Sequence, residues 1–271
     1  MINKLDLSAD SSTIVDALEK YAEEYRKNLY LPQFLRARQI VINHVVKYVS
    51  RGKRILDINC GTAIDAIKLA ELGYEVTGVD ISSAMISIAR EEISKAKVSS
   101  LVKLETADYR AMPKFEHKFD AVLSNFGGIN FAKDLNPIFK SVSDSLNQGG
   151  IFMVNTVNRI CAAEIAIFML KGRISKASRR ITGGKARIGG KLVELYYHPK
   201  RSFVNDGNRL GFKLIDSFGL NIFAPPLWAS DFFKFHGKVA GFLEQIDDAI
   251  RRIPLIRSLG DFMVLVFRKI E

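Results

Sequence analysis

The order of apolar and polar positions divides this chain into segments of two kinds. Apolar residues that recur every three or four positions predict amphipathic helices over residues 8–28, 33–49, 62–72, 82–97 and 134–146. Short, almost continuous apolar runs between turn residues predict strands that are buried on both faces. These strands cover residues 53–58, 74–80, 101–107, 119–125 and 151–157.

The predicted strands and helices alternate between residues 53 and 157. Such alternation is typical of a doubly wound α/β fold, in which a mostly parallel sheet carries helices on both faces. After residue 157 the pattern becomes irregular. We expect one helix over residues 159–181, a hairpin over 182–197, a helix over 199–210, strands at 211–220 and 262–268, and a largely helical, aromatic-rich stretch at 228–252.

This pattern suggests a core with additions. We expect an N-terminal helical lid (residues 1–52) and an α/β core (residues 53–157 and 203–271). Two cap insertions, residues 158–202 and 221–260, would lie with the lid over the carboxyl ends of the strands. Open α/β sheets bind ligands at that edge.

The positive charge is concentrated in one segment. The net charge of the chain is +11, and residues 171–191 contribute eight cations without one acid. The cations are Lys171, Arg173, Lys176, Arg179, Arg180, Lys185, Arg187 and Lys191. The positive charge is therefore a local feature, and a partner attracted by it would bind at this segment. The apolar positions of 160–181 predict one inward face, which would turn Arg173, Lys176, Arg179 and Arg180 outward.

Composition excludes several classes of protein. No apolar run reaches the roughly 18 residues of a membrane span, and the acidic N-terminus lacks the apolar region of a secretory signal. Cys60 and Cys161 lie far apart, which predicts neither a disulfide framework nor a zinc site and favours a reducing cytoplasm. No histidine or cysteine cluster indicates any other metal.

The most informative motif spans residues 54–65 and 78–80. An apolar run ends in Asp57, turns through small residues around Gly61 and opens into a helix, and the next strand ends in Asp80. Asp80 follows Gly61 by 19 residues. In βαβ nucleotide sites an acid at about this spacing reaches a ribose.

This motif resembles the cofactor site of class I S-adenosylmethionine-dependent methyltransferases, whose motif reads acid-x-Gly-x-Gly-x-Gly. The chain keeps Asp57 and Gly61, and has Asn59 and Ala63 in place of the first and third glycines. Among residues other than glycine, Asn best tolerates a left-handed backbone, and Ala has the smallest side chain after glycine. The resemblance implies a Rossmann-like sheet of seven strands whose last two strands are an antiparallel pair, with S-adenosyl-L-methionine as cofactor.

The resemblance also implies roles for residues at the strand ends. Asp80 would bind the ribose hydroxyls, Ile81 would pack on the adenine, and Asp108 would accept from the adenine amino group. Tyr109 and Met112 would flank the ring, and Asn125 would face the methionyl part. The full set of expected cofactor residues is Asp57, Asn59, Gly61, Ala63, Asp80, Ile81, Asp108, Tyr109, Met112 and Asn125.

The acceptor side carries weaker signals. Residues in or beside the insertions that could orient or deprotonate an acceptor are Tyr196, Tyr197, His198, Trp228, Asp231 and His236. The apolar insertions favour methylation of a small, fairly apolar molecule at oxygen, nitrogen or carbon. An RNA or protein methyltransferase and a non-catalytic cofactor-binding module remain alternatives. The basic segment 171–191 is interpreted as a solvated face or as a contact with an anionic membrane surface, and its lack of aromatic residues argues against nucleic acid.

Overall fold

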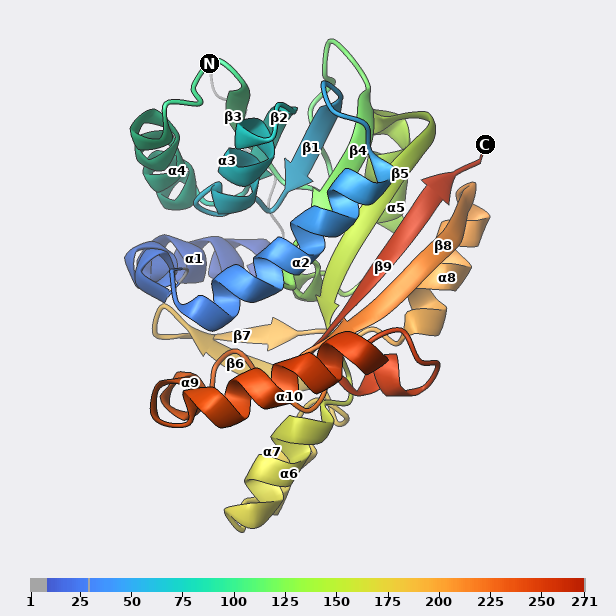
Figure 1. Cartoon of the computed structure of the whole chain (residues 1–271). Coiled ribbons are helices and arrows are strands. Elements are labelled where there is room, and N and C mark those ends of the chain that lie inside the picture. The colour runs from blue at the N-terminus through green and yellow to red at the C-terminus, as the bar shows by residue number, and fades with distance from the viewer. Residues whose placement is uncertain (1–8, 29, 271) are drawn as a thin grey trace.

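One seven-stranded sheet organises the molecule (Figure 1). The computed structural model describes residues 9–28 and 30–270. The strands are β1 (Arg54–Ile58), β2 (Glu75–Asp80), β3 (Val102–Thr106), β4 (Phe119–Ser124), β5 (Leu146–Val157), β8 (Phe212–Leu220) and β9 (Phe262–Lys269). They lie in the order β3-β2-β1-β4-β5-β9-β8, and β9 runs antiparallel to both of its neighbours. The predicted sheet, with its final antiparallel pair, is confirmed.

Helices cover both faces of this sheet. One face packs against α2 (Pro32–Tyr48), α3 (Ile64–Glu71) and α4 (Ser83–Ala96), and the other against α5 (Asn136–Ser145) and α8 (Lys200–Arg209). The central strands divide their side chains between the two layers: in β9, Val264 and Val266 join the first cluster, and Leu265 and Phe267 join the second. This two-sided burial explains why the strands lack apolar–polar alternation.

The connection between β3 and β4 contains no helix. Residues 107–118 form a loop, and the neighbouring sheet face carries the exposed side chains Lys103 and Glu105. A sheet face that meets water commonly carries polar side chains, as these residues of β3 do. The chain therefore departs here from a complete doubly wound pattern.

The remaining elements surround one end of the sheet. They are α1 (Ala9–Asn28), η1 (Gly128–Phe131), α6 (Ala162–Leu170), α7 (Ile174–Ala177), the hairpin β6 (Gly184–Ile188) and β7 (Lys191–Leu195), α9 (Ser230–Phe235), α10 (Gly237–Ile250) and η2 (Ile256–Leu259). The hairpin predicted over residues 182–197 is confirmed, and it turns at Gly189 and Gly190, which both have positive φ angles. No helix among the described residues is long and apolar enough to cross a bilayer.

The single helix predicted over residues 159–181 is wrong. The chain forms α6 and α7 instead, and Gly172 between them has a φ of 65°. The inward apolar face is also wrong in the outer half, because Leu170 is 89% exposed and Ile174 is 68% exposed. Glycine at a left-handed position ends a helix, and the apolar periodicity continued across that break.

The outward orientation predicted for Arg180 is wrong as well. Its guanidinium is buried, donating to the carboxylates of Glu164 and Asp261 at 2.7 Å each. Arg179 also donates to Glu164, at 2.7 and 2.9 Å, and the indole of Trp228 donates to the same carboxylate at 3.0 Å. The acids that pair with the basic segment lie outside it, so the segment's own charge pattern could not reveal them. This cluster joins α6 to the loop before α9 and to the start of β9.

This cluster predicts a large stability cost for Glu164→Gln. Removing one partner from a buried ion pair costs about 3–5 kcal/mol, because the other charges stay buried. We expect urea unfolding to show that the free energy of unfolding falls by about 3 kcal/mol or more. The matched control is Glu71→Gln, whose exposed pair with Lys68 should change stability by less than about 1 kcal/mol.

The same variant should change the acid sensitivity of the fold. Burial raises the pKa of Glu164, but the hydrogen bonds from Arg179 and Arg180 outweigh it and lower the pKa to about 2, from an ordinary value of 4.5. The contribution of Glu164 is then complete above about pH 4.5 and is lost as the pH falls toward 2. A Glu164→Gln protein as stable as wild type at pH 7 would contradict this account.

Candidate functional site

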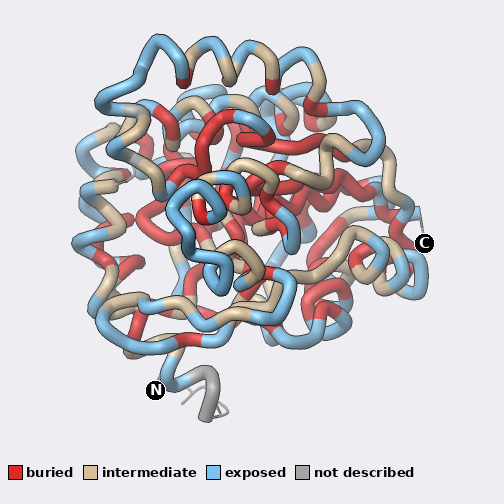
Figure 2. The backbone as a smooth tube through the Cα atoms, turned by 90° about the horizontal axis from the view of Figure 1, so that it is seen from below, coloured by how far each residue is buried: buried red, intermediate tan, exposed pale blue. Residues whose placement is uncertain are grey.

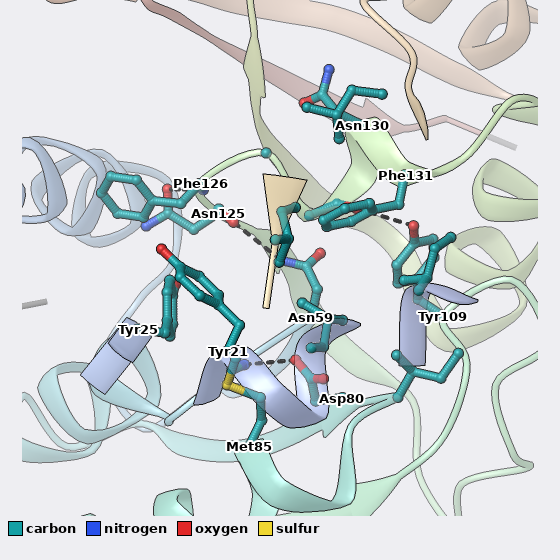
Figure 3. Close-up of a pocket in the computed structure, with 18 of the residues that line it drawn as sticks. Tyr21, Tyr25, Asn59, Asp80, Met85, Tyr109, Asn125, Phe126, Asn130 and Phe131 are labelled. Atoms are coloured by element: carbon teal, nitrogen blue, oxygen red, sulfur yellow. Dashed lines mark hydrogen bonds between the residues drawn. The ribbon is translucent and has the colours of Figure 1, made fainter. Parts of the chain in front are cut away.

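A cavity of about 260 Å³ lies at the carboxyl ends of β1, β2 and β4 (Figure 3). The loops that follow these strands form one wall of the cavity, called the floor here. The opposite wall, the roof, is formed by α1 and the hairpin β6–β7. The lining residues are Ile14, Leu18, Tyr21, Tyr25, Asn59, Gly61, Asp80, Ile81, Met85, Asp108, Tyr109, Arg110, Asn125, Phe126, Gly127, Gly128, Asn130, Phe131, Val157, Ile188 and Leu195. The lining is mainly apolar and aromatic, with carboxylates and amides from the strand ends.

The loop after β1 adopts a left-handed backbone at every second residue. Asn59, Gly61 and Ala63 have φ angles of 58°, 54° and 62°. The Asn59 side chain also fastens the loop to β4, since it accepts from Ser124 Oγ at 2.7 Å and donates to the carbonyl of Asn125 at 3.1 Å. The two substitutions for glycine therefore preserve the turn, at the modest strain that Ala63 bears.

The carboxylate of Asp80 holds two loops together. One oxygen accepts from the backbone N–H of Gly61 at 2.8 Å, and the other accepts from the N–H of Ser82 at 3.0 Å. Burial raises the pKa of Asp80 to about 6, although these N–H donors oppose the shift. Each carboxylate oxygen can accept a second hydrogen bond, so Asp80 can still receive donors from the cavity.

Asp108 forms an ion pair within its own loop. Its carboxylate accepts from the backbone N–H of Arg110 at 2.8 Å and from the guanidinium of the same residue. Tyr109, between them, donates its hydroxyl to the carbonyl of Gly128 at 3.1 Å (Figure 3). The acid faces the cavity with its charge already partly balanced.

Behind the cavity lies a buried polar network. Asn125 donates to Asp65 at 3.0 Å and accepts from Asn155 at 2.7 Å, and Asp65 is ion-paired with Arg38. The Arg38 guanidinium lies 4.4 Å from the centre of the Phe126 ring. The network therefore fixes the side chains of Asn125 and Phe126, which face the cavity.

The individual residues of the roof were not predicted from the sequence. Tyr21 and Tyr25 of α1 point into the cavity (Figure 3), and Ile188 and Leu195 come from the hairpin. A Cβ at Gly61 would lie 3.1 Å from the Tyr25 ring, so the glycine is needed for this approach. The only signal in the sequence was the helical spacing of Tyr21 and Tyr25, which packing alone would also explain.

Three residues expected at the cofactor lie outside the cavity lining. Asp57 in β1 and Ala63 at the end of the following loop are buried, and one oxygen of Asp57 has no hydrogen-bond partner among the described residues. Met112 packs against the core cluster below α5. The other seven expected residues all line the cavity, and what any of the ten binds stays a prediction.

None of the residues singled out on the acceptor side lines this cavity. Tyr196, Tyr197 and His198 border a separate surface pocket, where His198 contacts the carbonyl of Ala132 at 2.8 Å. Asp231 and His236 are exposed on and beside α9. Among the described residues of the second insertion, residues 221–260, none lines this cavity.

The cavity fits a nucleoside-bearing ligand. Asp80 offers unfilled acceptor sites, Asp108 offers a second carboxylate, and Ile81 and Met85 provide apolar contacts. Gly128 leaves room for the Asn59 side chain in the cavity wall, because a Cβ at Gly128 would lie 2.4 Å from it. Among the described residues no group of three or more His, Cys, Asp and Glu side chains could hold a metal ion. These carboxylates and apolar side chains therefore match the cofactor that the sequence motif implies.

Comparisons with known proteins point to one family. Residues 49–187, about half of the chain, match the family model described as a methyltransferase domain. The ubiquinone biosynthesis O-methyltransferase of Chelativorans sp. (strain BNC1) is 34% identical over 112 residues, which cover 41% of this chain and 43% of that protein. The chain thus matches less than half of the length of such curated relatives.

Solved structures share the fold. The CcbJ methyltransferase from Streptomyces caelestis has a TM-score of 0.65 and 16% identity, covering 96% of this chain and 98% of that one. An S-adenosylmethionine-dependent methyltransferase from Mesorhizobium loti has a TM-score of 0.58 and 20% identity, covering 86% of this chain and 97% of that one. At these identities the likeness is one of fold.

Proposed function

Because this chain belongs to the class I S-adenosylmethionine-dependent methyltransferase family, we propose that it methylates a small, fairly apolar molecule at oxygen, nitrogen or carbon. The observation that carries this proposal is the roof of the cavity. Tyr21, Tyr25, Phe131, Ile188 and Leu195 line the same cavity as the expected cofactor residues. A concave, mainly apolar site suits a small acceptor better than a polymer.

S-adenosylmethionine, the cofactor of this family, supplies an already activated methyl group when bound. The chain's own residues would then position and enclose the reactants. Asp80 and Asp108 would hold the nucleoside, while α1 and the hairpin exclude water from the acceptor. The cavity lining includes no histidine, lysine or glutamate among the described residues, and burial raises the pKa of Tyr25 to about 12. Alignment and desolvation would therefore provide most of the rate enhancement, and alignment alone contributes up to about 7–11 kcal/mol in favourable cases.

The acceptor class also has support from relatives and from the placement of the basic segment. Relatives are named as O-methyltransferases of ubiquinone biosynthesis, which favours oxygen on a small molecule. Within residues 171–191 only Ile188 lines the cavity, so the cations of this segment do not surround the acceptor space as an RNA substrate would require. Cys60 and Cys161 are free and buried, which suits the reducing cytoplasm included in this proposal.

Turnover assays on acceptor panels test the function. We expect S-adenosylhomocysteine to form with small phenols, amines or activated carbon acids of low polarity. Turnover with RNA or protein substrates alone would overturn the acceptor class. Tight cofactor binding without turnover on any panel would show a binding module that has lost catalysis.

The first prediction about the cofactor concerns pH. Ribose hydroxyls favour ionised Asp80, and the pKa of this group in the free protein is about 6. Protonation then competes with binding, so affinity for S-adenosylhomocysteine should be about tenfold weaker at pH 5 than at pH 7.5. Calorimetry across this range measures it.

The matched variant is Asp80→Asn, which cannot ionise. It should bind weakly at every pH and lose the pH dependence. Its single amide oxygen keeps an acceptor for only one of the N–H groups of Gly61 and Ser82. If the affinity of the wild-type protein for S-adenosylhomocysteine did not change between pH 5 and 8, the assignment of Asp80 to the ribose would be wrong.

The second prediction concerns Asp108 and the adenine ring. A charge-assisted hydrogen bond contributes about 1.5–3 kcal/mol, so Asp108→Asn should weaken S-adenosylhomocysteine by about tenfold or more. The inosine analogue lacks the amino group, and its affinity should change much less. A large fall in melting temperature with unchanged affinity for both ligands would show that Asp108 only holds Arg110 and its loop.

A further inference from the structure

The helices α6 and α7 form an arm that projects from the body below α10 (Figure 1). The tip of this arm, residues 169–176, combines large exposed apolar side chains with cations. Leu170 is 89% exposed, Ile174 is 68% exposed and Met169 is 53% exposed. Lys171, Arg173 and Lys176 are exposed between and beside them, and no ion pair involves these three among the described residues. Figure 2 views the molecule from this end, where exposed segments lie nearest the viewer.

The base of the arm is firmly held. Glu164, buried in α6, binds Arg179, Arg180 and Trp228, and the Phe168 ring stacks on Trp228 with centroids 5.6 Å apart. Arg180 continues the connection to Asp261 at the start of β9. These contacts hold the arm in one position against the body. Its exposed apolar tip is therefore part of the folded structure.

We propose that the tip of the arm, residues 169–176, docks onto an anionic lipid bilayer. Large apolar side chains interleaved with Lys and Arg are the composition of segments that lie in the membrane interface, where the apolar groups enter the acyl boundary and the cations meet the headgroups. The charge on the tip is entirely positive, so it complements the anionic lipids.

The charges argue against the other occupants. A second copy of the chain would bring two positive tips together, and like charges across an interface are strongly unfavourable. Single-stranded RNA would need aromatic stacking platforms, and residues 171–191 contain no aromatic residue. Both remain outcomes of the experiment below.

Two variants separate the contributions of charge and apolar contact. The first is the triple substitution Lys171→Gln, Arg173→Gln, Lys176→Gln, and the second is Leu170→Ser with Ile174→Ser. The charge control is the triple substitution Lys103→Gln, Lys114→Gln, Lys118→Gln, which removes three exposed cations elsewhere on the surface. None of these residues lines the cavity. Each variant should therefore bind S-adenosylhomocysteine as wild type does, and this unchanged affinity would show that the variant is folded.

The measurement is co-sedimentation with vesicles of phosphatidylcholine, with and without phosphatidylglycerol. Each cation near an anionic surface strengthens binding by about fivefold, so the charge variant should bind phosphatidylglycerol vesicles about 100-fold more weakly than wild type. The serine variant should lose at least about tenfold. The charge control should keep most of its binding, and no protein should bind neutral vesicles tightly.

Several results would overturn the proposal. Wild type that does not bind anionic vesicles, or a charge control that weakens as much as the tip variant, would show that the tip is not a docking site. Light scattering that shows a dimer abolished by the serine variant would assign the tip to self-association. RNA binding that needs the three cations, without vesicle binding, would assign it to nucleic acid.

Discussion

The arrangement of the site depends on one buried carboxylate. Asp80 ends β2, yet its oxygens satisfy backbone N–H groups of the loops after both β1 and β2. Buried N–H groups need such partners, so the two loops are fixed in relation to each other. A second carboxylate attaches the roof close by: Glu19 of α1 accepts from the backbone N–H groups of Ser83 and Ala84, directly after the second loop. The floor and the roof of the cavity are therefore both attached to the segment around residues 80–84.

The enclosed half of the cavity depends on polar contacts between distant segments. The buried amide of Asn130 donates to the carbonyl of Tyr196 at 2.8 Å and accepts from the N–H of Val157 at 2.9 Å. This side chain ties the end of the hairpin to the end of β5. At the hairpin's turn, Lys191 pairs with Asp16 of α1 at 3.0 Å, so the two halves of the roof also hold each other.

The basic segment shows how a charge pattern is resolved by packing. Its eight cations looked alike along the chain, but Arg180 is buried while Lys171, Arg173 and Lys176 are exposed. The difference comes from Glu164 and Asp261, which folding brings to Arg180. A buried guanidinium needs such partners, and only the tertiary structure shows which cation receives them.

The apolar pattern by itself predicted the five parallel strands between residues 53 and 157, because the spacing of apolar residues directly reflects which faces are buried. The final antiparallel pair came from the resemblance to the family. The sequence also placed Asp80 and Asp108 at strand ends, since parallel strands bring those ends to one edge. It could not place Tyr25, Ile188 or Arg180, because their positions depend on contacts with residues far along the chain. Local periodicity records burial but not the partner, so the roof of the cavity and the exposed tip of the arm were decided by tertiary packing alone.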